Sequence, residues 1–170
     1  MTLGLSLQAF TQLHVAISLI AILAGVIVLF GMLAARRLPA VTAVFLVMTI
    51  LTDITGYMFP FTGFKPSYVV GTIDLLLLIL AMIALYSKHL AGPWRTTYVV
   101  SAVIALYLNV FVGVVQTFEK VPSFVAMPKL APVFQIVTLL LFIVLGYFAV
   151  KRIPQPPSQG RCGENPRWEG

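Results

Sequence analysis

The chain has 170 residues, of which 60% are hydrophobic and 9% are charged, and its mean hydropathy is +1.02. A soluble domain carries about a quarter charged residues, so this composition excludes an ordinary soluble domain and is typical of an integral membrane protein. The net charge of +6 comes from 11 Lys and Arg against 5 Asp and Glu, and the lone Cys162 excludes an internal disulfide framework, a Cys-based zinc site and a CxxC redox pair.

Five uncharged apolar runs are long enough to cross a bilayer, which needs about 20 helical residues. In chain order, the predicted spans cover about 10–35, 40–59, 68–87, 97–118 and 131–150. Short segments rich in Pro, Gly and charge separate the spans. Because every connection is short, we predict an all-α integral membrane domain over residues 1–150, an up-and-down bundle of five transmembrane helices.

The first span is expected to stay in the protein. No Lys or Arg precedes it, and its apolar run is longer than the hydrophobic region of a cleaved signal peptide. By contrast, residues 151–170 change abruptly to Pro, Gly and polar residues that cannot bury a core. They predict a disordered cytoplasmic tail.

The basic residues predict the orientation of the bundle. One side carries Arg36, Arg37, Lys88, Arg95, Lys151, Arg152, Arg161 and Arg167. The other side carries Lys65, Lys120 and Lys129. Because cytoplasmic loops are enriched in Lys and Arg, we expect the N-terminus outside and the C-terminus inside the cell.

The distribution of the basic residues also indicates which binding partners to expect. The basic residues lie beside span ends and form no stripe with interleaved aromatics, so no nucleic-acid partner is expected. The expected partner is the lipid bilayer. Five helices are few for a transporter, so a pore would require a homo-oligomer or a larger membrane complex.

Polar residues within the spans are the candidate site. Asp53 and Asp74 each lie 14 residues from a cytoplasmic anchor, Pro39 and Lys88, and so about 21 Å along their helices. Asn109, 14 residues beyond Arg95, reaches the same level, and His14, Gln116 and Gln135 fall between it and the outer interface. Helical spacing places these residues on stripes with small residues. The sequence therefore predicts an outward-opening polar pocket formed by His14, Asp53, Asp74, Asn109, Gln116 and Gln135.

Two interpretations of these residues stay open. Asn and Gln commonly join membrane helices through hydrogen bonds worth about 0.6 kcal/mol each, which favours packing for Asn109, Gln116 and Gln135. Carboxylates within a membrane are costly, which favours function for Asp53 and Asp74. Facing one another, they would share a proton or bind a cation. His14 is either their partner or an interfacial imidazole.

Motifs for other chemistry are weak. His14 and His89 lie near opposite ends of their spans, about 30 Å apart along the normal, which excludes one bis-histidine haem held by this chain alone. His14, Asp53 and Asp74 could ligate a divalent metal, although their spacing carries no signature. The sequence contains no P-loop, GxGxxG, HExxH or GxSxG pattern. We therefore predict no cofactor and no catalytic residue.

Four short runs resemble a group of small bacterial multi-pass membrane proteins: residues 56–61 (GYMFPF), 84–86 (ALY), 89–95 (HLAGPWR) and 105–111 (ALYLNVF). The similarity extends from the first span to Arg152. It implies a bacterial inner-membrane location. The group has no assigned activity, so the resemblance supplies no catalytic residue.

These observations favour a polar pocket that binds or transports a proton, a cation or a small polar solute. One alternative is a non-catalytic accessory subunit of a membrane complex, in which the polar stripes only pack helices. A second, less favoured alternative is a membrane-embedded redox or metal enzyme, which a visible spectrum and metal analysis of the purified protein would detect.

Overall fold

A computed structural model describes residues 6–59, 66–127 and 129–152, and all the regular elements in these ranges are helices. Five helical segments are long and apolar enough to cross a membrane: α1 (Leu7–Leu33), α2 (Pro39–Tyr57), α3 (Pro66–Met82) with its continuation η1 (Ile83–Ser87), α4 (Trp94–Lys120) and α6 (Leu130–Arg152). The prediction of five helices that are long and apolar enough to cross a membrane is confirmed. The short helix α5 (Pro122–Val125), between α4 and α6, was not predicted.

The ends of the helices have local causes. Helix α1 begins three residues before the predicted span because the Ser6 hydroxyl accepts a hydrogen bond from the Ala9 N–H at 3.2 Å, an N-cap. Pro39 opens α2, where its missing N–H costs nothing. At the far end of η1, His89 and Leu90 adopt positive φ angles of 49° and 59°, and the Leu90 N–H donates to the Ala84 carbonyl at 3.0 Å. This left-handed turn ends the third span.

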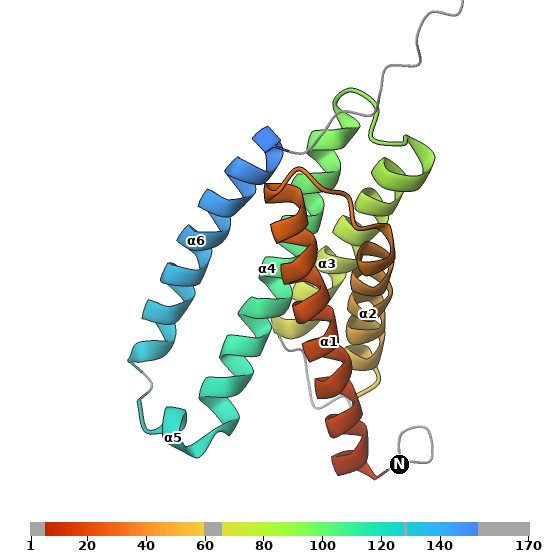
Figure 1. Ribbon diagram of the computed structural model, residues 1–170. Coiled ribbons are helices and arrows are strands. Elements are labelled where there is room, and N and C mark those ends of the chain that lie inside the picture. Colours follow the sequence, from red (N-terminus) through yellow and green to blue (C-terminus); the bar gives the residue numbers. More distant parts are fainter. Residues whose placement is uncertain (1–5, 60–65, 128, 153–170) are drawn as a thin grey trace, which may run out of the picture.

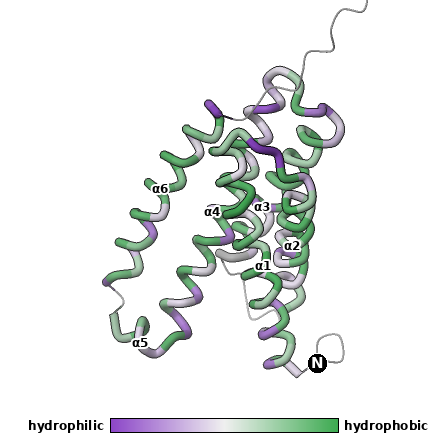
Figure 2. The backbone as a smooth tube through the Cα atoms, viewed as in Figure 1, coloured by the Kyte–Doolittle hydropathy of each residue, from purple (hydrophilic) through white to green (hydrophobic). Residues whose placement is uncertain are grey.

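The helices run up and down, so their connections gather at two ends of the molecule (Figure 1). The first end, here called the basic end, holds six of the eight described Lys and Arg: Arg36, Arg37, Lys88, Arg95, Lys151 and Arg152. The opposite end holds Lys120 and Lys129. Apolar residues predominate along all the long helices, whereas the connection from α1 to α2 is strongly hydrophilic (Figure 2). Lys65, Arg161, Cys162, Arg167 and the predicted tail beyond Arg152 lie outside the described residues.

The core lies mainly among α1, α2, α3 and α4, and α6 contributes Phe142 and Ala149 to it. Gly25 on α1 allows the closest packing, since a Cβ atom there would lie 2.5 Å from Leu106 Cδ1 and 2.8 Å from the Phe45 ring. Small residues permit such approach between membrane helices. Helix α6 differs, because it packs mainly on α4 and α1, is the least buried of the five and leans away from the other helices (Figure 1).

Candidate functional site

A buried carboxylate and a buried carboxamide face each other between α3 and α4. The side chain of Asp74 is 2% exposed, and that of Asn109 is 8% exposed. The Asn109 Nδ2 donates a hydrogen bond to Asp74 Oδ2 at 3.3 Å. The structure therefore brings these two residues to one level, where counting from Lys88 and Arg95 had placed them.

A second carboxylate comes from α2, which packs against both α1 and α3. Asp53 is half-buried, and its charge lies within electrostatic range of Asp74. Two buried oxygens, Asp53 Oδ2 and Asp74 Oδ1, accept no hydrogen bond from the part of the chain that the structure describes. Polar atoms buried without partners are costly, so this pair calls for a physical explanation.

A buried hydroxyl adds to the two acids. Thr49 lies one helical turn before Asp53 on the same face of α2, and its Oγ1 is also buried without a hydrogen bond from any described residue. We call Thr49, Asp53, Asp74 and Asn109 the acidic site. Carboxylate, carboxamide and hydroxyl oxygens are ligands of hard cations, and two neighbouring carboxylates can also share one proton.

His14 lies elsewhere. Its Nδ1 is 2.7 Å from the Thr55 Oγ1, and its ring packs edge-on to Phe59 with 5.3 Å between the ring centroids. Thr55 lies two residues after Asp53 and therefore points from a different face of α2. In residues 6–59, 66–127 and 129–152, no three His, Cys, Asp or Glu side chains are grouped to hold a metal ion. The structure thus does not join His14 to the two carboxylates.

The two glutamines of the predicted pocket also lie apart from the acids. Gln116 is two turns from Asn109 on the same face of α4, about 10 Å along the axis. Gln135 on α6 donates from Nε2 to the Phe111 carbonyl at 3.0 Å and so links α6 to α4. Among the described residues neither glutamine Oε1, though buried, accepts a hydrogen bond. Of the six predicted residues, the structure therefore joins Asp74 to Asn109 by a hydrogen bond, whereas His14 and Gln135 contact other partners.

One side-chain contact of a predicted site residue was missed by sequence reasoning. Nothing in the sequence distinguishes Thr55, the partner of His14, from the nearby Thr52, whose hydroxyl donates to the Met48 carbonyl of its own helix. The difference depends on how α1 and α2 are rotated about their axes. That rotation follows from packing and has no local sequence signal.

Comparison with known proteins gives no relative: no family model, no curated protein and no solved structure matches the chain. The resemblance to small bacterial membrane proteins therefore stays a prediction. Any functional argument has to come from the geometry of the acidic site.

Proposed function

We propose that the protein is a multi-pass protein of a bacterial inner membrane, and that its acidic site binds a proton or a small hard cation during transport. One observation carries the proposal. Two carboxylates on neighbouring membrane helices lie within electrostatic range, and each has a buried oxygen that accepts no hydrogen bond from the described residues. Such carboxylates within a membrane are rare and typically mark ion or proton pathways.

The position of the acids supports access from the opposite end of the bundle. Asp53 lies four residues before the end of α2, about 6 Å along the axis, and Asp74 lies eight residues after the start of α3, about 12 Å. Both are therefore nearer to the opposite end than to the basic end. If the basic end is cytoplasmic, the site opens outward.

The orientation has its own test. Six of the eight described basic residues lie at the basic end, which favours a cytoplasmic position by the positive-inside rule. Cys162 follows α6 in the sequence and should then be protected in intact cells from an impermeant thiol reagent, yet labelled after the membrane is permeabilised. Labelling in intact cells would contradict this orientation.

The site is tested with the purified protein in detergent. Binding of Na⁺ to the folded state alone would stabilise it by about 2.7 kcal/mol at a concentration 100-fold above Kd. We expect Tm to depend on Na⁺, measured against choline, or on pH. Asp53→Asn and Asp74→Asn should each abolish that response with little change in volume, since an amide carries no charge.

Glu119→Gln is the matched control, because it also removes one carboxylate but from an exposed position at the end of α4. It should keep the full response. A double variant, Asp53→Asn with Asp74→Asn, that folds with native stability and retains the wild-type cation and pH response would overturn the proposal. That outcome would favour the accessory-subunit alternative, in which Asn replaces the acids as a packing residue.

Transport itself is measured after reconstitution into liposomes. A Na⁺ or proton gradient should dissipate faster through vesicles with the wild-type protein than through vesicles with either Asp→Asn variant. Equal rates for the wild-type protein and the variants would limit the acidic site to a binding or packing role.

A further inference from the structure

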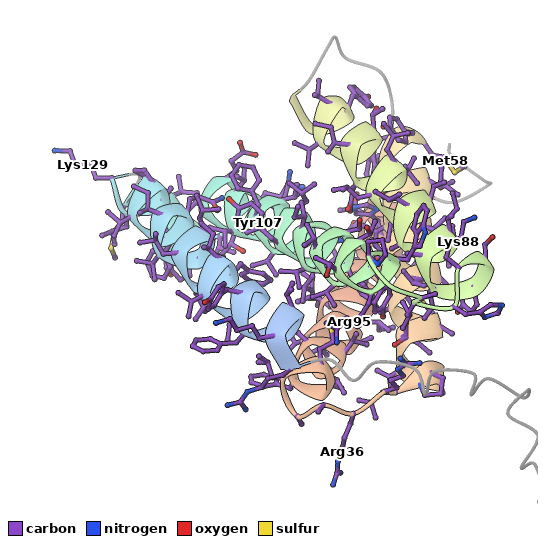
Figure 3. All side chains as sticks on the ribbon, turned by 90° about the horizontal axis from the view of Figure 1, so that it is seen from above. Arg36, Met58, Lys88, Arg95, Tyr107 and Lys129 are labelled. Atoms are coloured by element: carbon purple, nitrogen blue, oxygen red, sulfur yellow. The ribbon has the colours of Figure 1, made fainter. Side chains whose placement is uncertain are left out.

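An apolar groove of about 410 Å³ runs between α4 and α6. Val100 and Tyr107 line it from α4, and Ile143 and Tyr147 line it from α6. Figure 3 shows Tyr107 between the two helices, where its ring packs against Phe142 with 5.7 Å between centroids. The volume falls in the range of small-molecule sites, about 300–1,000 Å³, and the lining suits a hydrocarbon chain.

The length of the groove corresponds to one leaflet of a bilayer. On α6 the lining extends over 12 residues, from Leu139 to Val150, which is about 17 Å along the axis. The hydrocarbon core of a membrane is about 30 Å thick, so the groove covers roughly half of it. Val150 lies at the basic end, and the groove therefore extends from there to about the middle of the membrane.

A cation flanks the groove where it reaches the basic end. Lys151 directly follows Val150, and its Nζ lies 4.5 Å from the ring centroid of Tyr147, a lining residue. Of the acidic residues that the structure describes, none lines the groove. The apolar channel thus ends at positive charge.

We propose that the groove binds one anionic phospholipid of the leaflet at the basic end. One acyl chain lies along α4 and α6, and the phosphate contacts Lys151. The apolar lining accepts any acyl chain, so the selectivity for a negative headgroup comes from this cation, which attracts anionic lipids. The proposal does not depend on the acidic site.

The groove is tested by native mass spectrometry of the full chain, purified with phosphatidylglycerol or with phosphatidylcholine of the same acyl chains. We expect the wild-type protein to retain one phosphatidylglycerol and to lose phosphatidylcholine. Ile143→Trp should fill the groove and abolish retention. Leu141→Trp is the matched control, because Leu141 is similarly exposed but points from the opposite face of α6.

The headgroup contact is tested with Lys151→Gln. This variant also tests the lipid proposal if Ile143→Trp does not fold. Loss of one basic residue near a membrane surface should weaken phosphatidylglycerol binding about fivefold. Arg36→Gln removes the same charge at the basic end, but Arg36 points away from α4 and α6 (Figure 3) and should leave binding unchanged. Equal retention of both lipids, wild-type retention by Ile143→Trp, or a lipid-free dimer would overturn the proposal.

Discussion

Helix α4 has a closely packed side and a loosely packed side. Toward α1, α2 and α3 its residues are almost completely buried, and Leu106 lies 1% exposed where Gly25 approaches. Toward α6 it leaves the apolar groove. The difference has a physical origin, because lipid tails are as apolar as Leu and give no hydrophobic force between helices. Close packing in a membrane therefore requires small residues and polar contacts. Gly25 and the Asn109–Asp74 hydrogen bond on the first side are buried more completely than Gly146 and the Gln135–Phe111 hydrogen bond toward α6.

The packing difference between the two sides of α4 is tested most strongly by adding one methyl group on each side. Gly25→Ala would place a Cβ 2.5 Å from Leu106 Cδ1, whereas Gly146→Ala would place one 3.2 Å from Val103 Cγ1. Overpacking a tight core costs about 1–3 kcal/mol, and we expect this loss for Gly25→Ala. Gly146→Ala should cost less than about 1 kcal/mol, since Val103 has to move only slightly and Ala favours the helix.

The measurement is the free energy of unfolding, obtained by titrating a denaturing detergent into mixed micelles and following helix content. Gly113→Ala is the control, because its nearest contact would be Ile22 Cδ1 at an ordinary 3.8 Å. It should be neutral or slightly stabilising. Equal losses for Gly25→Ala and Gly146→Ala would show that the two sides of α4 are packed alike.

A smaller effect distinguishes the polar contacts on the two sides. Asn109→Leu removes the donor to Asp74 and leaves this buried carboxylate without a described hydrogen bond, at a cost of about 1–2 kcal/mol. Gln135→Leu should cost about 0.5 kcal/mol, because the Phe111 carbonyl keeps the acceptor role within its own helix. The same unfolding titration compares them. If Gln135→Leu lost more unfolding free energy than Asn109→Leu, the polar contact in the acidic site would not be the stronger of the two.

Much of this architecture could be predicted from the sequence. Span length and hydropathy sufficed for the five helices, and counting residues from basic anchors placed Asp74 and Asn109 at one level. Two features could not be obtained that way. The lean of α6 and the pairing of His14 with Thr55 depend on helix tilt and rotation, which arise from contacts between helices. Residue counting measures depth along a straight helix and contains no information about which neighbour a side chain meets.

The smallest expected effect concerns the His14–Thr55 contact between α1 and α2, which a double-mutant cycle tests. His14→Ala alone loses both the Thr55 hydrogen bond and the ring contact with Phe59, so only the cycle with Thr55→Val isolates the hydrogen bond. Hydrogen bonds between membrane helices contribute about 0.6 kcal/mol on average, and we expect a coupling free energy of that size. Thr52→Val provides the matched control, since the Thr52 hydroxyl donates to Met48 of its own helix, and its coupling to His14 should be near zero. Equal coupling for the two threonines would mean that α1 and α2 are rotated differently in the membrane. In that case His14 would again become a candidate partner of Asp53.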